Sequence, residues 1–64
     1  MKLWTYIGKK VMITFKDGEE LNGIVTHYDD AVDNETGEDS IIFKVGKASY
    51  DIDESEIKYI EILD

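Results

Sequence analysis

The sequence predicts an all-β protein: a five-stranded antiparallel small barrel with one short helical turn before the last strand. Three observations indicate this fold. Apolar and polar residues alternate over short segments, turn-forming residues such as Asp17-Gly18 separate these segments, and no proline interrupts the 64 residues. A chain this short is expected to form one domain, residues 1–64.

The first strand is predicted where Val11, Ile13 and Phe15 alternate with less apolar neighbours. Asp17-Gly18 follows directly, and this dipeptide accepts the positive φ of a tight hairpin turn.

The second strand is expected from about Glu20 to Tyr28. Gly23 lies within it and predicts a bulge or a sharp bend, which would let one strand serve both halves of a barrel. Strict alternation assigns Leu21 and Val25 to one face, and Ile24 and Tyr28 to the other.

Residues 29–39, DDAVDNETGED, hold six acidic residues and no basic residue, and Asn34 and Gly37 favour turns. This composition predicts a solvated loop. Two further strands are then predicted at 41–45 and 48–52, joined by Gly46-Lys47.

Asp53 to Glu56 is predicted to form the short helical turn, with Asp53 able to cap it. Residues 57–63 are predicted as the fifth strand, with Ile60 and Ile62 facing inward. A helix over 53–63 is the alternative, because Ile57, Ile60 and Leu63 also fit helical spacing; the enrichment in Ile and Tyr favours a strand.

Two aromatic residues, Trp4 and Tyr6, precede the first strand. We expect them to cap one end of the barrel rather than face a partner, since large aromatic side chains usually close cores. A core this small supplies roughly 3–5 kcal/mol, so association into a homo-oligomer is left open.

The charge of the chain narrows the classes of function. Seven lysines face fifteen acidic residues, giving a net charge of -8, and there is no arginine. Residues 1–32 carry a net charge of -1 and residues 33–64 a net charge of -7. A binder of nucleic acid needs basic side chains against the phosphates, so direct nucleic-acid binding is disfavoured.

Location is indicated by what the composition lacks. There is no apolar run long enough to span a membrane, no cysteine for disulfides or a cysteine-based zinc site, and no apolar secretory signal in the opening MKLWTYIGKK. We therefore expect a cytoplasmic protein without membrane contact.

The region from Ile7 to about Asn34 resembles the first motif of the Sm-like family, one of the SH3-like small barrels. The matching residues are Gly8, the alternating Val11-Ile13-Phe15, Asp17-Gly18, Gly23 and the pair Tyr28-Asp29. The ending SEIKYIEIL, residues 55–63, resembles the short turn and last strand of these barrels. The resemblance implies a small barrel and, in many members, a ring that binds RNA.

The RNA-binding motifs of that family are not matched. Counting from Asp29, the position of the family's loop Asn holds Asp33; counting from Asp30 reaches Asn34 but leaves Asp33 where an apolar residue is expected. The basic step before the last strand is replaced by the acidic YDIDESE, residues 50–56, and the family's N-terminal helix is not predicted. Carboxylates at these positions repel phosphate.

No catalytic set is apparent, so we expect no enzyme activity and no cofactor. His27 is the only histidine, and we expect it on the surface of a strand. The acidic loop does not fit an EF-hand, because Gly37 in the sixth place puts Val32 in the first ligand position, and we assign no metal site. A weak, non-specific divalent site is left open.

The leading hypothesis is a non-enzymatic module that binds a basic protein surface, such as that of a nucleic-acid-binding enzyme, and mimics nucleic acid. In size and acidity the chain is similar to phage-encoded inhibitors of defence nucleases, including anti-CRISPR proteins. The predicted contact residues fall in two acidic stretches: Asp29, Asp30, Asp33, Glu35, Glu38 and Asp39, and Asp51, Asp53, Glu54 and Glu56.

Two alternatives stay open. One is an Sm-like oligomeric ring that contacts RNA through backbone groups and stacking on Tyr28 or Tyr50. The other is a barrel that serves as a structural subunit. Solubility alone also accounts for a net charge of this size in a small domain.

Overall fold

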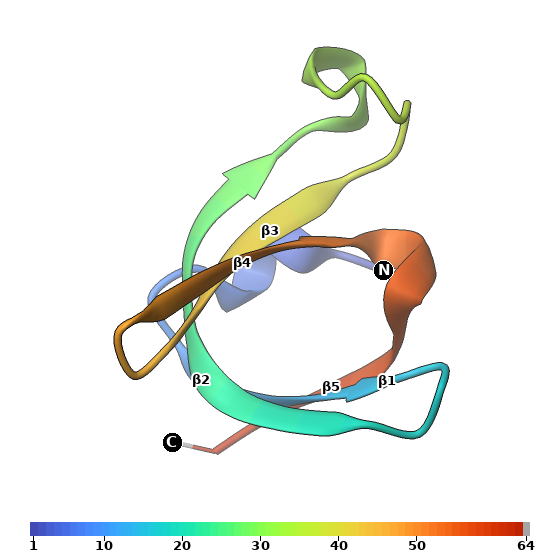
Figure 1. Ribbon diagram of the computed structural model, residues 1–64. Helices are drawn as coiled ribbons and strands as arrows, with labels where there is room; N and C mark the ends of the chain where they lie inside the picture. The colour runs from blue at the N-terminus through green and yellow to red at the C-terminus, as the bar shows by residue number, and fades with distance from the viewer. Residues whose placement is uncertain (64) are drawn as a thin grey trace.

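The computed structural model describes residues 1–63, and of Asp33 only the backbone. It confirms the predicted all-β class, since five antiparallel strands form one sheet in the order β4-β3-β2-β1-β5 (Figure 1). The strands are β1 (Lys10–Phe15), β2 (Glu20–Asp29), β3 (Ser40–Val45), β4 (Ala48–Asp53) and β5 (Ile57–Ile62).

Short 3₁₀ turns flank the strands: η1 (Leu3–Tyr6), η2 (Ala31–Asp33) and η3 (Glu54–Glu56). The predicted turn before the last strand is η3, and Asp53 takes its N-cap position. The structure adds η1, where the sequence predicts no helical segment, and η2, which lies within the predicted loop.

The sheet curls around its core without closing. Within residues 1–63, β4 pairs with β3 and β5 pairs with β1, whereas β4 and β5 do not pair with each other. Figure 1 shows β4 passing across from β1 and β5 on the opposite side of the curled sheet. The predicted small barrel is therefore open along one seam.

The long strand β2 belongs to both halves of the sheet, as predicted. Residues 20–24 pair with β1, and residues 24–29 pair with β3. A Cβ at Gly23 would fall well inside contact distance of the Lys44 carbonyl oxygen and 3.0 Å from Cζ of Phe43. Glycine is needed here because the backbones of β2 and β3 approach closely where β2 changes partner.

The bulge in β2 lies at Thr26, between Val25 and His27, and not at Gly23. This extra residue resets the alternation of side chains. Val25 is paired with Phe43 on the core face, and Tyr28, three residues later, is paired with Ile41 and packs against the core. The assignment of Tyr28 to the face opposite Val25 is therefore wrong.

A second register shift, between Thr14 and Phe15, falls opposite the start of β5. Ile57 pairs with Phe15 and is buried, and Ile60 pairs with Ile13 and packs against the core. Ile62 pairs with the buried Val11 and therefore shares the inward face of Ile60, as predicted, but it is 46% exposed near the end of β5 and is not part of the core. The helix-like spacing of Ile57 and Ile60 thus comes from an irregular strand.

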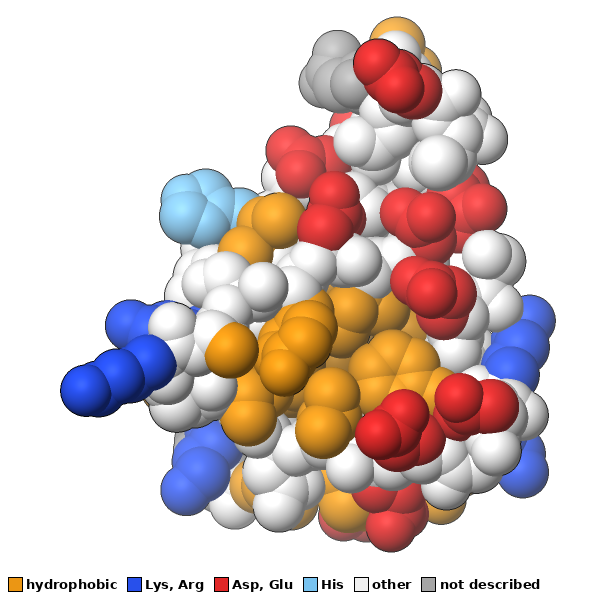
Figure 2. Space-filling model, in the orientation of Figure 1, with side chains coloured by type: hydrophobic (Ala, Val, Ile, Leu, Met, Phe, Trp, Pro, Cys, Tyr) orange, Lys and Arg blue, Asp and Glu red, His pale blue; other side chains and the backbone are white. Residues whose placement is uncertain are grey.

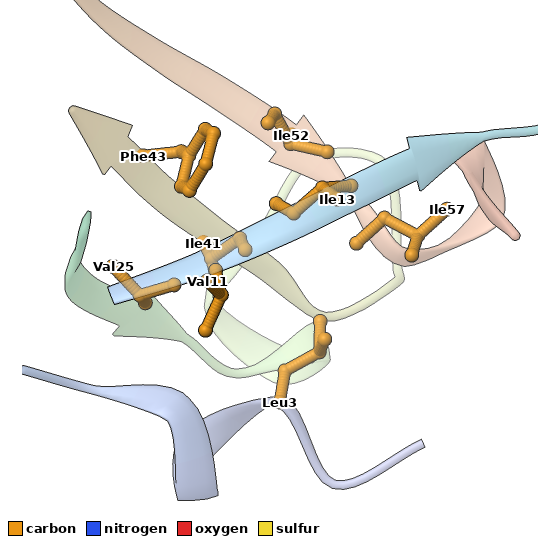
Figure 3. Packing of buried hydrophobic residues seen from close by; sticks show 8 residues of the cluster. All are labelled: Leu3, Val11, Ile13, Val25, Ile41, Phe43, Ile52 and Ile57. Atoms are coloured by element: carbon orange, nitrogen blue, oxygen red, sulfur yellow. The ribbon is translucent and has the colours of Figure 1, made fainter. Parts of the chain in front are cut away.

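The core consists of eight apolar side chains from η1 and all five strands (Figure 3): Leu3, Val11, Ile13, Val25, Ile41, Phe43, Ile52 and Ile57. Burying one aliphatic or aromatic side chain stabilises the fold by about 1.5–3 kcal/mol. Every strand therefore contributes to the free energy of unfolding, which is small in a core of this size.

The N-terminal turn closes one end of this core through Leu3, which is fully buried. Tyr6 packs against the core, but Trp4 is 49% exposed and contacts the ring of Tyr28 edge-on at 5.9 Å. The prediction that the aromatic residues pack against the core is therefore correct for Tyr6. Trp4 lies outside the core, against the ring of Tyr28.

The helical turns of residues 1–63 are far shorter, and less apolar, than a helix that crosses a membrane.

Substituting Gly23 with alanine tests the close approach of β2 and β3. We expect Gly23→Ala to lower the free energy of unfolding by about 1–3 kcal/mol, because the new methyl group meets backbone atoms that cannot rotate away. Urea unfolding followed by circular dichroism measures this loss.

The exposed neighbour Asn22 provides the matched control, and Asn22→Ala should change stability by no more than about 0.5 kcal/mol. Equal losses in the two variants would contradict the steric explanation.

Candidate functional site

The fold brings the two predicted acidic stretches together at one end of the sheet. Ser40 and Asp53 form a cross-strand pair of β3 and β4, so the chain enters β3 where it leaves β4. The carbonyl oxygen of Asp39 accepts a hydrogen bond from the backbone N–H of Glu54 at 2.9 Å. These contacts join residues 38–40 to residues 53–55.

A side chain completes the connection between the two stretches. Oε1 of Glu38 accepts a hydrogen bond from the backbone N–H of Ser55 at 2.7 Å. Oε2 of Glu56 accepts one from the N–H of Asp53 at 3.0 Å, which fixes the start of η3. Glu38 therefore holds the acidic loop against η3.

Seven predicted residues are linked by these hydrogen bonds or by the charge interactions given below, and we call them the acidic face: Asp30, Glu38, Asp39, Asp51, Asp53, Glu54 and Glu56. Figure 2 shows acidic side chains running along one side of the molecule, from the projecting loop to its lower edge.

The other predicted residues lie apart from these contacts. Glu35 is exposed in the projecting loop, and Asp29 is half-buried at the end of β2. The side chain of Asp33 lies outside the described residues.

Asn34 fixes the shape of the acidic loop. Its Nδ2 donates to the carbonyl oxygen of Glu38 at 2.8 Å, to Oγ of the buried Ser40 at 3.1 Å and to the carbonyl oxygen of Asp29 at 3.4 Å. Its amide thus ties both ends of the loop together. The prediction of a solvated loop holds for Glu35 but not for Asn34, which is half-buried.

The carboxylate of Asp39 is used within the loop as well. Its Oδ1 accepts a hydrogen bond from the backbone N–H of Ala31 at 2.9 Å, at the start of η2. Asp30 caps the same turn, with its Oδ1 accepting from Val32 N–H at 3.4 Å. These acidic side chains therefore shape the loop itself.

The negative charges of the acidic loop contribute to a raised pKa of Tyr28, which lies beside the loop. Partial burial and a hydrogen bond to Asp39 raise the pKa of Tyr28 to about 12. The negative charges of Asp30, Asp39 and Glu54 act in the same direction, because they disfavour the phenolate.

The pKa of the Asp53 carboxyl group is raised in a similar way. Partial burial raises the pKa of Asp53 above its ordinary value. The charges of Glu38, Glu56 and Asp51 raise it further, in that order. One cation lies close by, since the Met1 ammonium is 3.0 Å from Oε1 of Glu54.

The carboxylates of the acidic face are nevertheless spaced apart. Among the described residues, no three His, Cys, Asp or Glu side chains come close enough to share a metal ion. The face presents spread negative charge rather than a compact oxygen cage.

His27 is exposed on β2, as predicted for a histidine on the surface of a strand. Its Nδ1 lies 3.2 Å from Oγ1 of Thr26, the residue at the bulge.

The sequence did not indicate a groove that lies between β4 and the β1–β2 hairpin. Its volume is about 330 Å³. Asp17 was assigned only to a turn and Glu19 to no element, and the fold places both opposite residues of β4. We call it the β4 groove; its lining residues are Phe15, Asp17, Glu19, Leu21, Tyr50, Asp51, Ile52 and Glu56.

The sequence matches no protein-family model, no curated protein and no solved structure in the comparisons made.

Removing the amide of Asn34 tests the folded state of the acidic loop. We expect Asn34→Asp to destabilise the protein by about 1–3 kcal/mol, because a carboxylate cannot donate to the carbonyl groups of Glu38 and Asp29. Urea unfolding measures the loss, and hydrogen exchange of the loop amides locates it.

The adjacent, exposed Glu35 serves as the control, and Glu35→Gln should leave both measurements nearly unchanged. If the loop amides of Asn34→Asp are as well protected as those of the wild type, the Asn34 amide does not hold the ends of the loop together.

The raised pKa of Tyr28 predicts a loss of stability at alkaline pH. The unfolded chain loses this phenol proton near pH 10 and the folded chain near pH 12, so protonated Tyr28 stabilises the fold below pH 10. This contribution decreases as the pH rises from about 10 to about 12.

Urea unfolding across this range should therefore show a steeper loss in the wild-type chain than in Tyr28→Phe. Deprotonation of lysines cancels in the difference between the two proteins. Parallel losses would show that Tyr28 is not the group responsible.

Proposed function

We propose that the chain is a non-enzymatic protein-binding module whose acidic face occupies a basic surface of another protein, in the manner of a nucleic-acid mimic. The observation that carries the proposal is the pair of hydrogen bonds from Glu54 and Ser55 to Asp39 and Glu38. They hold two acidic stretches, separate in sequence, as one surface.

A surface of this kind suits a cationic partner for an electrostatic reason. Partial burial and then the charges of neighbouring carboxylates raise the pKa of Asp53, and a positively charged partner would relieve this repulsion between carboxylates. Complementary potentials also steer the encounter and raise the rate of association. Because internal hydrogen bonds already position Glu38 and Asp39, little ordering is required when the partner binds.

The class of partner follows from what an acidic surface can replace. Enzymes that act on nucleic acids carry positively charged channels for the phosphate backbone, and a rigid row of carboxylates can fill such a channel. The net charge of -8 and the lack of arginine disfavour a complex with nucleic acid itself. Inhibition of a nucleic-acid enzyme, as by phage anti-CRISPR proteins in the cytoplasm, is the function that we propose.

Displacement of DNA from an RNA-guided nuclease tests this proposal. We expect the chain to compete with a labelled target duplex for the nuclease, and the acidic-face variant Asp30→Asn/Asp53→Asn/Glu54→Gln to compete less well and with a weaker dependence on salt. Fluorescence anisotropy of the duplex, at several salt concentrations, measures both effects.

The chain alone should give no mobility shift with DNA or RNA at low salt. A tight complex with an oligonucleotide at ordinary ionic strength would refute the proposal, as would competition that the triple substitution leaves unchanged in strength and in salt dependence.

An Sm-like ring that contacts RNA is the second candidate, and the free edges of β4 and β5 favour it. These two strands end the sheet on either side, so the edge of β4 in one copy can pair with the edge of β5 in the next. Light scattering separates the candidates, because a closed hexamer or heptamer supports the ring and a monomer or dimer supports the inhibitor.

A further inference from the structure

The β4 groove combines an apolar floor with an acidic rim. On one side of the groove, Phe15 and Leu21 are partly buried and pack against the core. On the other side, Ile52 is buried in the core and Tyr50 is 45% exposed. Figure 2 shows hydrophobic side chains open to solvent near the centre of the view, with acidic side chains beside and below them. Apolar surface is thus accessible between β4 and the β1–β2 hairpin.

The outer edge of β4 runs along this groove. Gly46-Lys47 forms a two-residue turn, with φ of 60° at Gly46, so Val45 and Ala48 close the hairpin as a hydrogen-bonded pair. Alternation along the strand then directs the backbone N–H and C=O groups of Ser49 and Asp51 away from β3.

Asp53, two residues after Asp51, supports the conclusion that these backbone groups point away from β3. The N–H of Asp53 donates to Oε2 of Glu56 rather than to β3. In the described part of the chain no strand pairs with the outer edge of β4, so the groups of Ser49 and Asp51 face the groove.

The charge around the groove selects the occupant. Four carboxylates line it, those of Asp17, Glu19, Asp51 and Glu56. Lys16 lines the adjoining hollow, together with Asp17 and Glu56, and offsets part of this charge. A second copy of the chain would bring a net charge of -8 toward this rim, whereas a basic segment would be attracted to it.

We propose that the β4 groove binds an extended basic segment of a partner protein, which adds to the sheet as a strand beside β4. The inference rests on the proposed function and specifies its partner: a segment in which Lys or Arg alternates with an apolar residue.

The alternation follows from the two faces of an added strand. Its side chains point alternately into the groove and outward, as do those of β4, where Tyr50 and Ile52 face the core and Asp51 faces outward. Apolar side chains of the segment would cover Tyr50, Ile52 and Leu21. Basic side chains would lie beside Asp51 and reach Glu19 on the opposite rim.

A capped hexapeptide of alternating lysine and valine, equal in length to β4, is the probe. We expect it to bind in fluorescence anisotropy, and to shift the NMR amide signals of Ser49 and Asp51 more than those of the acidic loop. Asp17→Asn/Glu19→Gln should weaken binding about fivefold at low salt, because two rim carboxylates are lost. In Asp17→Asn the side-chain oxygen still accepts from the N–H of Glu19, so the turn is preserved.

The matched protein control is Glu35→Gln/Glu61→Gln, which changes the net charge equally at two exposed residues outside the groove and the acidic face, and it should bind the peptide as the wild type does. The matched peptide control carries N-methyl groups on alternate backbone nitrogens and should not bind, because it cannot pair with β4. Equal weakening in the two double variants, or equal binding of the methylated peptide, would overturn the inference.

Two further results would also overturn it: no binding of the lysine-valine peptide to the wild-type chain, or concentration-dependent shifts of the Ser49 and Asp51 amides in the free chain, which would assign the edge to a second copy. These results are distinguishable from a failure of the proposed function. If the peptide does not bind but the chain still displaces DNA from the nuclease, only the groove proposal fails. If the peptide binds but the chain does not displace DNA, only the proposed nuclease inhibition fails.

Discussion

The fold depends on the close packing of β2 against β3 at Gly23. This strand pairs first with β1 and then with β3, and the change of partner occurs at Ile24, next to the glycine. A side chain at Gly23 would meet the Lys44 carbonyl and the ring of Phe43, so the bend requires a residue without Cβ. Because β2 joins both halves of the sheet, this contact sets how the remaining strands surround the core.

Register shifts in β2 and β5 adapt a short chain to a curved sheet. Each shift lets two side chains three residues apart, such as Ile57 and Ile60, face the same core. Just before the bulge, Val25 exchanges hydrogen bonds with the N-terminal segment, which continue the β1–β2 pairing: its carbonyl oxygen accepts from Gly8 N–H at 2.7 Å and its N–H donates to the Lys9 carbonyl oxygen at 3.2 Å. These hydrogen bonds help to position η1, which closes one end of the core through Leu3.

The open seam and the acidic face share η3. The turn follows β4, holds Glu38 through the N–H of Ser55, and places Glu56 on the rim of the β4 groove. A partner that lay across the acidic face and extended along β4 would contact both surfaces without a change in the sheet. The charge of the face and the exposed edge of β4 thus support one type of partner, a basic protein with an extended segment.

By itself, the sequence determined the strands, their turns and the two acidic stretches, since alternation, Asp17-Gly18 and local composition act over a few residues. It did not determine that Tyr28 faces inward, because a single extra residue in a strand reverses every later side chain. The contact of Glu38 with Ser55 and the groove lined by Asp17 and Asp51 join residues distant in the chain. Only the tertiary structure decided these features, because they arise where the register of β3 and β4 and the unclosed seam bring separate segments together.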